Sequence, residues 1–539
     1  MTARDPDIVD VTTLPDLLLR AARRWPDHTA LVFPDDRRTY AELWEGVERT
    51  ARGLIALGVR PGEHVGVYMA NCVDFVEVLF GAALAGAVVV PINARYRADE
   101  LAYVIADADL AALVTSDLVA EHVDHVARVR DALRRGSAPL LRTLVALGRG
   151  PSEGFVSRDE LTAAADTAPG AEVERRRAAL SVRDVVLIMY TSGTTAHPKG
   201  CLISHEALVR NGIALGRQRF AIRDDDVFWD PLPMFHMSAV LPLVGVIDAG
   251  AAFASMVHFD AEAALDQMER EGATLAFPAF PTVTLALLNH PSFPRRDLRR
   301  LRMLNTTGPP ETAYQVQRAL PHVVQISPYG CTEAGGVVCF SEASDTPEQR
   351  ATFSGRPFRG LEVRIVDPLG RPLPPGEPGE ITVRGYALFD GYYKDPEKTA
   401  ASVDADGFFH TGDLGVVDED GRVQFRGRLK DMLKVGGENV AAAEIEALLC
   451  QHPAVAVCQV VGIPDPRLEE VPAAFVELVP GASASPEELI AFCRERVASF
   501  KVPRVVRQVS EWPMSATKIL KRKLREQLLE ELQASQAQG

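Results

Sequence analysis

The chain has 539 residues, of which 47% are hydrophobic, 24% charged and 7% aromatic, as in ordinary globular proteins. A chain of this length is expected to form several packing units rather than one core. The formal net charge of -15 disfavours nucleic acid and acidic membranes as partners of the whole surface, so any phosphate binding has to be local.

The seven cysteines are scattered without C-x-x-C spacing, so we expect neither a disulfide framework nor a zinc site, and a cytoplasmic location. Residues 1–7 are polar and acidic, unlike a signal peptide. The candidates for a membrane span are residues 78–90 and 240–256. The first run is too short, and the second contains Asp248 and Gly250. We interpret the second as a buried helix running into a strand and expect no integral membrane association.

The first part of the chain alternates between two kinds of segment. Amphipathic helices are expected within residues 14–60. Short apolar strands and helices then follow in turn, at residues 65–69, 74–84, 87–92, 98–106 and 111–115. This alternation favours mostly parallel sheets that are covered on both faces. Residues 126–180 are rich in Arg, Ala and Gly with weak patterning, and we interpret them as surface excursions.

The most informative stretch comes next, at residues 190–200, with the sequence YTSGTTAHPKG. Small hydroxyl residues surround a glycine, and a lysine follows; these residues are Thr191, Ser192, Gly193, Thr194, Thr195 and Lys199. Such a loop can direct several N–H and O–H donors toward one point, which attracts phosphate oxygens, and the lysine adds a positive charge. It is not a Walker A loop, because its lysine follows a proline. The stretch therefore predicts phosphate binding without defining the fold.

The hydrophobic pattern of the sequence changes twice after this stretch. Strand-like segments continue the alternation up to about residue 304. From residue 359, alternating strands at 361–366, 380–384 and 423–426 are separated by Pro/Gly turns and predict a small β-barrel. After Arg428, two helices and two strands predict a small α+β unit.

The stretch at residues 190–200 resembles the phosphate-loop signature of the adenylate-forming superfamily: acyl-CoA synthetases, peptide-synthetase adenylation domains and luciferases. Ala196 stands where the family usually has glycine. Further family motifs occur in the expected order, at residues 234–237, 307–310, 329–333, 410–413, 427–446 and 515–523. The resemblance covers nearly the whole chain. It implies an N-terminal adenylation and acyl-binding domain at residues 1–427, a hinge at 428–431 and a mobile C-terminal domain at 432–539.

The resemblance also implies a nucleotide site. In it, Tyr329 stacks on adenine, Thr332 contacts the α-phosphate, Asp413 bridges the ribose hydroxyls and Glu333 holds Mg²⁺, which prefers carboxylate and phosphate oxygens. Ser327, which is also expected to bind the nucleotide, stands where relatives often have asparagine. The remaining nucleotide-binding residues are expected to be Thr191, Ser192, Gly193, Thr194, Thr195, Lys199, Gly308, Pro309, Pro310, Gly330, Cys331, Phe425 and Arg428.

For the chemistry, the resemblance points to Lys518, which would contact the carboxylate and phosphate oxygens during adenylation, together with Thr332, Glu333 and His236. Thr517 precedes Lys518 where the family usually has glycine, and we predict a negative φ for it, since a left-handed conformation costs a non-glycine residue about 1–2 kcal/mol. Lys430 occupies the hinge position. The CoA-binding loop is expected to contain Lys434, Gly436 and Gly437.

For the acid, amino-acid-activating relatives carry an aspartate in the segment that here contains Phe235, His236 and Met237. The absence of an acidic residue there argues for a carboxylic acid without an α-amino group. His236 is expected to gate an apolar acyl pocket that is lined by Phe277, Phe280, Thr306 and Thr307.

The function implied by the resemblance is acyl-CoA synthesis, in which a carboxylic acid, ATP and CoA give acyl-CoA, AMP and pyrophosphate with the help of Mg²⁺. Within enzymes, the alternatives are acyl transfer to a carrier protein, release of acyl-AMP, and a luciferase-like oxidation. Because of Ala196 and Thr517, a thioester-forming half enzyme or a protein that binds acyl-adenylate made elsewhere also stays open. The sequence leaves open which acid is used and whether the chain forms a homodimer.

Overall fold

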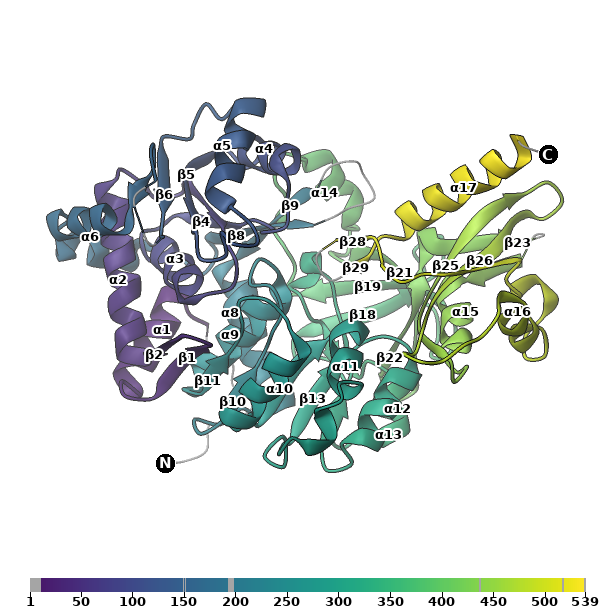
Figure 1. The fold of residues 1–539 in the computed structure, drawn as a ribbon. Helices are drawn as coiled ribbons and strands as arrows, with labels where there is room; N and C mark the ends of the chain where they lie inside the picture. The colour runs from purple at the N-terminus through teal and green to yellow at the C-terminus, as the bar shows by residue number, and fades with distance from the viewer. Residues whose placement is uncertain are drawn as a thin grey trace.

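The computed structural model describes residues 11–148, 150, 152–191, 198–435, 438–515 and 518–537. In Figure 1 a large N-terminal part, coloured purple to green, lies beside a smaller yellow-green C-terminal unit. The N-terminal part contains two large sheets and two smaller antiparallel ones. This arrangement confirms the expected fold class of covered, mostly parallel sheets followed by a separate α+β unit.

The first large sheet has seven strands in the order β14-β13-β12-β10-β11-β1-β2. All neighbouring strands are parallel except the β1–β2 pair. Its strands are β1 (Thr29–Phe33), β2 (Asp36–Thr39), β10 (Val227–Trp229), β11 (Ala252–Ala254), β12 (Leu275–Ala279), β13 (Met303–Thr306) and β14 (Val324–Ile326).

The second large sheet has eight strands in the order β20-β9-β8-β4-β3-β5-β6-β7, and only the pairs made by β9 are antiparallel. The β8–β9 pair carries the two ends of the predicted phosphate loop, with Thr191 opposite Lys199. The strands are β3 (His64–Tyr68), β4 (Val88–Pro91), β5 (Leu110–Thr115), β6 (Thr143–Ala146), β7 (Val156–Ser157), β8 (Val185–Thr191), β9 (Lys199–Ser204) and β20 (Gly391–Tyr392).

Helices fill the space between these sheets and cover their outer faces. The largest apolar cluster lies between the two sheets and includes α1 (Leu14–Arg24), α2 (Tyr40–Ala56), α3 (Val73–Leu84), α8 (His205–Leu215) and α9 (Met237–Ala249). A second cluster buries α4 (Ala98–Asp107) and α5 (His125–Arg135) on the eight-stranded sheet. A third buries α10 (Ala261–Arg270), α11 (Pro281–Leu288) and α12 (Pro310–Ala319) on the seven-stranded sheet.

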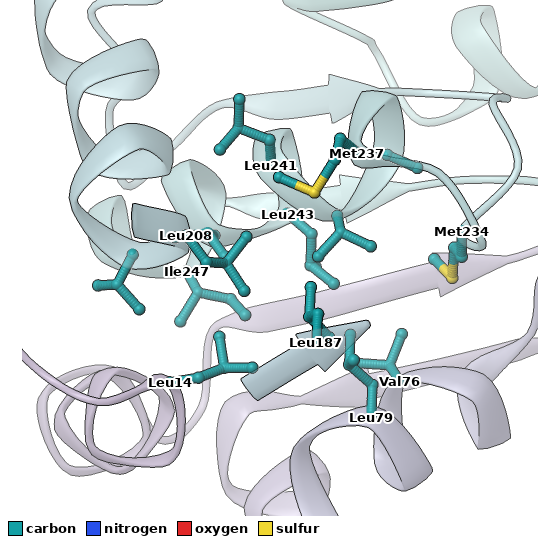
Figure 2. Packing of buried hydrophobic residues seen from close by; sticks show 14 of the residues in the cluster. Leu14, Val76, Leu79, Leu187, Leu208, Met234, Met237, Leu241, Leu243 and Ile247 are labelled. Carbon is teal, nitrogen blue, oxygen red and sulfur yellow. The ribbon is translucent and has the colours of Figure 1, made fainter. Parts of the chain in front are cut away.

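The helix α9, in the layer between the two large sheets, is apolar on nearly all sides, as expected of a fully buried helix. Gly250 ends it in a left-handed conformation (φ 77°), and β11 follows. This confirms the predicted buried helix running into a strand. Within the described residues, no helix is long and apolar enough to cross a membrane. Figure 2 shows how buried apolar side chains pack together in this layer; the labelled residues are Leu14, Val76, Leu79, Leu187, Leu208, Met234, Met237, Leu241, Leu243 and Ile247.

Residues 126–180 differ from the prediction. They do not simply form surface excursions, because β6 and β7 extend the eight-stranded sheet and α6 (Arg158–Thr167) packs against α2. Short strands and arginine-rich helices such as α5 and α7 (Gly170–Ala179) bury few apolar residues each. Their hydrophobic pattern is therefore weak, although their backbones are regular.

The region after residue 359 also differs from the prediction. Instead of a small β-barrel, it forms a four-stranded antiparallel sheet in the order β18-β19-β21-β22. No described ladder joins β18 to β22, and α15 contacts the edge strand β22. The strands are β18 (Leu361–Val366), β19 (Gly379–Gly385), β21 (Phe409–Val417) and β22 (Val423–Arg428). A three-stranded antiparallel sheet precedes them: β15 (Pro328–Tyr329), β16 (Cys339–Phe340) and β17 (Arg356–Pro357).

The C-terminal unit is built on a five-stranded sheet. In Figure 1, β28 and β29 lie on the side of this unit that faces the N-terminal part, and β23 lies at the opposite side. Contacts of α15 with β22 and of β25 with α11 join the two parts. The elements are β23 (Met432–Val435), β24 (Glu438–Ala441), α15 (Ala442–Leu449), β25 (Val455–Asp465), β26 (Glu469–Leu478), α16 (Pro486–Arg494), β27 (Val505–Gln508), β28 (Met514–Ser515), β29 (Lys518–Ile519) and α17 (Lys521–Ala537).

Short helical segments complete the described chain. Two of them matter for the site, because they carry predicted functional residues: η3 (Thr332–Ala334) and η4 (Leu429–Asp431). The others are the π-helix η1 (Gly216–Phe220), the 3-10 helices η2 (Phe293–Arg295) and η5 (Ser499–Lys501), and the short α-helices α13 (Pro347–Thr352) and α14 (Pro396–Ser402).

Candidate active site

Tyr329 and Asp413 come from two different small sheets and meet in the interior. The Tyr329 hydroxyl donates a 2.9 Å hydrogen bond to Asp413 Oδ2, and both side chains are buried. Burial, followed by the nearby negative charge of Asp413, raises the pKa of Tyr329 well above its usual value. The hydroxyl therefore stays protonated and remains a donor. This bond fixes one edge of the Asp413 carboxylate.

The other edge of Asp413 faces β22. Asp413 and Arg428 are opposite one another in the β21–β22 ladder, and Arg428 Nε lies 3.2 Å from Asp413 Oδ1. Phe425, on the same strand, lies nearly parallel to Tyr329 with the ring centroids 6.0 Å apart, and its side chain is exposed. The turn before Asp413 is held by Glu380, which accepts the Gly412 N–H at 2.9 Å. Two predicted nucleotide residues, Tyr329 and Arg428, thus hold this carboxylate, and Phe425 lies beside Tyr329.

A second group forms around Glu333 in η3. The Tyr392 hydroxyl donates to Glu333 Oε1 at 3.0 Å, and the Glu333 carbonyl accepts the Phe389 N–H at 2.9 Å. Lys199 Nζ lies 5.4 Å from the centroid of the Tyr392 ring and 3.2 Å from Asp395 Oδ2. The predicted metal-binding carboxylate and the predicted phosphate-binding lysine are thereby joined through one tyrosine.

The chemistry of this group fits Mg²⁺ bound together with phosphate. Glu333 offers hard carboxylate oxygens, and Mg²⁺ usually takes one or two carboxylates and completes its shell with water and phosphate oxygens. Within the described residues, no cluster of three or more His, Cys, Asp or Glu forms a dedicated metal cage. A metal at this position would therefore depend on the phosphates of a nucleotide.

The segment between Tyr329 and Glu333 turns tightly. A Cβ added to Gly330 would lie 2.3 Å from the Gly336 carbonyl oxygen, so only glycine fits there. The Cys331 thiol has a pKa well above its usual value, because of burial and then the charge of Glu333. It is thus no candidate nucleophile. Thr332 begins η3 and is partly buried.

The Ser327 side chain makes hydrogen bonds within the protein. Its hydroxyl donates a 2.7 Å hydrogen bond to the Arg350 carbonyl, and its hydroxyl oxygen accepts from Gln325 at 2.9 Å. The side chain is therefore engaged in holding the loop between β14 and β15. The backbone of Ser327 also bonds to Ser341.

The second predicted nucleotide loop follows β13. Gly308 has φ of 105° and is exposed, while Pro309 and Pro310 start α12. Before it, the Thr307 N–H and hydroxyl both donate to the Ala279 carbonyl, at 2.6 and 2.9 Å, and Thr306 is buried beside Thr284. These bonds tie the ends of β12 and β13 together.

The predicted acyl-pocket residues lie in two environments. Phe277 is 2% exposed and sits in a cluster of aromatic rings with Phe220, Phe228 and Phe340. Phe280 and His236 are only partly buried and immediately precede α11 and α9, respectively. The His236 ring meets that of Phe235 edge-on, with centroids 4.8 Å apart. Of these residues, Phe280 and His236 are thus the more accessible ones.

The predicted hinge lies in η4, between β22 and β23. Lys430 has a lowered pKa, because of partial burial and then the positive charge of Arg428. Lys434 is exposed, and its N–H donates to Glu470 at 3.1 Å. Lys518 is described by its backbone, as the first residue of β29. The predicted residues that lie outside the described residues are Ser192, Gly193, Thr194, Thr195, Ala196, Gly436, Gly437 and Thr517.

Two polar residues near Lys199 were missed by the sequence analysis. Tyr392 contacts both Lys199 and Glu333, and Asp395 contacts Lys199, although the two lie more than fifty residues from these partners in the chain. No local spacing predicts such contacts. Only the segment GYYKDP at residues 391–396, which combines aromatic and charged residues after a strand, could have drawn attention to them.

Covered, mostly parallel sheets followed by a separate C-terminal unit, with residue groups gathered around Asp413 and Glu333, are the architecture of an adenylate-forming enzyme. Family models agree: "AMP-binding enzyme" matches residues 18–393 and "AMP-binding enzyme C-terminal domain" matches residues 444–518. The chain belongs to the AMP-binding enzyme family, and within it to the AMP-forming acyl-CoA ligases.

The relatives support this assignment over nearly the whole length. A ligase of Rhodococcus jostii, named for the CoA thioester of a methyl-dioxo-octahydroindenyl propanoate, is 37% identical, covering 96% of this chain and 99% of the relative. A feruloyl-CoA synthase of an Amycolatopsis species is 36% identical, covering 94% and 97%. The solved structure of the anthranilate CoA ligase AuaEII with anthranoyl-AMP superimposes with a TM-score of 0.86 at 28% identity, covering 98% of this chain and 99% of that one.

Proposed function

We propose that this chain converts a carboxylic acid with an apolar body to its CoA thioester, through an acyl-AMP bound between Tyr329, Asp413 and Glu333. The observation that carries the proposal is the pairing of Asp413 with both Tyr329 and Arg428. A buried carboxylate that is held in a fixed orientation is suited to accept hydrogen bonds from two vicinal ribose hydroxyls. The ring of Tyr329 or Phe425 would stack on the adenine.

In the first half-reaction, a carboxylate oxygen of the acid attacks the α-phosphorus of ATP, and the bond to pyrophosphate breaks. Lys199 is in place to exchange its ion pair with Asp395 for the phosphates. We assign Thr332 to the α-phosphate and Lys518 to the charge that develops between the two reactants, since nucleotidyl transfer depends on electrostatic stabilisation. Mg²⁺ on Glu333, when bound, would neutralise charge on the phosphates.

In the second half-reaction, the CoA thiol attacks the acyl carbon of the mixed anhydride, and AMP leaves with the bonding electron pair. We assign residues 1–427 and 432–539 to two domains that rearrange about residues 428–431. Turning at Lys430 would withdraw Lys518 and bring the loop with Lys434, Gly436 and Gly437 toward the site. A thiol with a pKa near 8.5 attacking an activated acyl group needs little assistance from a base.

The acid itself is inferred from the chemistry around α9 and α11. His236 and Phe280 begin these helices and are partly accessible, and the nearby side chains are apolar or small. Both relatives described above are named for acids that carry rings. We therefore expect an acid with an apolar body and no α-amino group. We place the reaction in the cytoplasm, because all seven cysteines are free, as in reducing compartments.

The test is pyrophosphate release across a panel of carboxylic acids that includes aliphatic, aromatic and fused-ring members. We expect ATP–pyrophosphate exchange with the correct acid in the absence of CoA, and thioester formation only when CoA is added. A carrier protein bearing phosphopantetheine serves as the alternative acceptor. If no acid supports exchange, while supplied acyl-AMP is converted to acyl-CoA, the chain is a half enzyme and the proposal is wrong. Size-exclusion chromatography with light scattering tests for the homodimer.

A further inference from the structure

An ion pair anchors the segment that carries Lys518. Lys521, the first residue of α17, lies three residues after Lys518 in the chain. Its Nζ is 2.6 Å from Oε1 of Glu446 on α15, and the two side chains are only 23% and 12% exposed. Pairs on the open surface are screened by water and contribute little, whereas a largely buried pair fixes its partners more firmly.

Glu446 is itself held in place. The same Oε1 accepts a 2.8 Å hydrogen bond from the Val460 N–H in β25. The helix that bears Glu446, α15, contacts β22, the strand that ends at Arg428. The ion pair therefore joins the start of α17 to the strand that lines the proposed ribose site.

The pair also lies next to the proposed nucleotide site. A cleft of about 220 Å³ is lined by Phe425, Arg428, Asp431, Glu446 and Lys521, together with small residues of α15. Lys521 thus faces the same space as the residues assigned to the ribose and the hinge. With Glu446 opposite, its charge is neutralised within the site.

A second anchor is Ile519, the last residue of β29. Ile519 packs against an apolar cluster that includes Val461 and Ile463 of β25 and Leu524 of α17. Both anchors follow Lys518 closely in the chain, since Ile519 is the next residue and Lys521 is the third residue after Lys518. Without the ion pair, the start of α17 would lose its polar tie to α15, and the apolar contacts of Ile519 would remain.

We propose that the ion pair between Lys521 and Glu446 positions Lys518 for the adenylation half-reaction. The inference rests on the proposed role of Lys518 and adds a positioning residue to it. Because a displacement of about 1 Å in a reacting group can cost about 100-fold in rate, loss of the pair is expected to slow adenylation by about 10- to 100-fold. The attack of CoA on acyl-AMP does not use Lys518, so its rate is expected to change little.

The experiment compares Lys521→Met, Lys521→Arg and Lys501→Met with the wild type in both half-reactions. Lys501 pairs with Glu444 on the same helix α15, at 2.5 Å, and is the matched control. We expect Lys521→Met to lose pyrophosphate exchange and keep thioester formation from supplied acyl-AMP. Lys521→Arg should restore most of the exchange, and Lys501→Met should match the wild type in both. Unchanged exchange in Lys521→Met, or equal loss in both half-reactions, would overturn the inference.

Lys518→Ala separates this inference from the proposed function. If Lys518→Ala loses exchange while Lys521→Met keeps it, only the positioning role is wrong. If Lys518→Ala keeps exchange, the proposed role of Lys518 fails, and the inference fails with it.

Discussion

Asp413 is the residue on which the proposed nucleotide binding depends most. Its carboxylate is buried between the Tyr329 hydroxyl and the Arg428 guanidinium, with one oxygen toward each. In the proposed function, a carboxylate held in this way would accept the ribose hydroxyls without further rearrangement. These contacts would form equally in the ground state and the transition state, so they should affect affinity more than turnover.

Asp413→Asn should therefore raise the KM for ATP by about tenfold or more and change kcat much less, because a hydrogen bond to a charged group contributes about 1.5–3 kcal/mol. The measurement is ATP–pyrophosphate exchange at varied ATP. Asp420→Asn is the control, since Asp420 lies in the turn of the same sheet and pairs with Arg422. A KM equal to that of the wild type would show that Asp413 does not contact the nucleotide.

Single residues also show the limits of sequence analysis. The motif that contains Tyr329 and Glu333 can be recognised in the sequence, because its spacing is local. The partners of these residues cannot be recognised, because Asp413 lies 84 positions from Tyr329 and Tyr392 lies 59 positions from Glu333. Ser327 is a similar case, since only the structure reveals its bond to Arg350.

At the scale of elements, the close packing of α8 on α9 sets the distance between the two large sheets. A Cβ added to Gly212 would lie 2.5 Å from a methyl group of Val244 and 2.9 Å from the Leu241 carbonyl. A Cβ added to Gly245, on the facing helix, would lie 2.7 Å from the Gly212 carbonyl oxygen. The two backbones therefore approach through glycines.

Gly212→Ala should lower the free energy of unfolding by about 1–3 kcal/mol, the usual cost of overpacking a core. It is expected to shift the thermal midpoint of the N-terminal part downward. Gly170→Ala is the control, because nothing lies within 4 Å of its added Cβ. Equal midpoints for the two variants would mean that α8 and α9 separate at little cost.

Elements with a strong periodic pattern can be predicted from sequence, and weakly patterned ones cannot. The buried helix α9 and strand β11 follow directly from their apolar run. The helices α6 and α7 each bury at most two residues, so their sequences resemble those of loops. Alternating strands at residues 361–428 predict an antiparallel sheet, but strand pattern alone does not decide whether the sheet closes.

At the scale of the whole molecule, the C-terminal unit contacts the N-terminal part through α15 on β22 and β25 on α11. The 3-10 segment η4, which contains Lys430, connects the two parts. The order of the family motifs in the sequence predicts this organisation. The domain boundaries and the rearrangement about residues 428–431 stay predictions.

The account depends on one pocket that is served in turn by two parts of the C-terminal unit. The measurement that tests it most directly is the rate of each half-reaction in Lys518→Ala, in single turnovers. We expect adenylation to fall by about 100-fold or more, as when a group that stabilises developing charge is removed. Thioester formation from supplied acyl-AMP should stay within a few-fold of the wild type. Equal losses in both half-reactions would contradict the account.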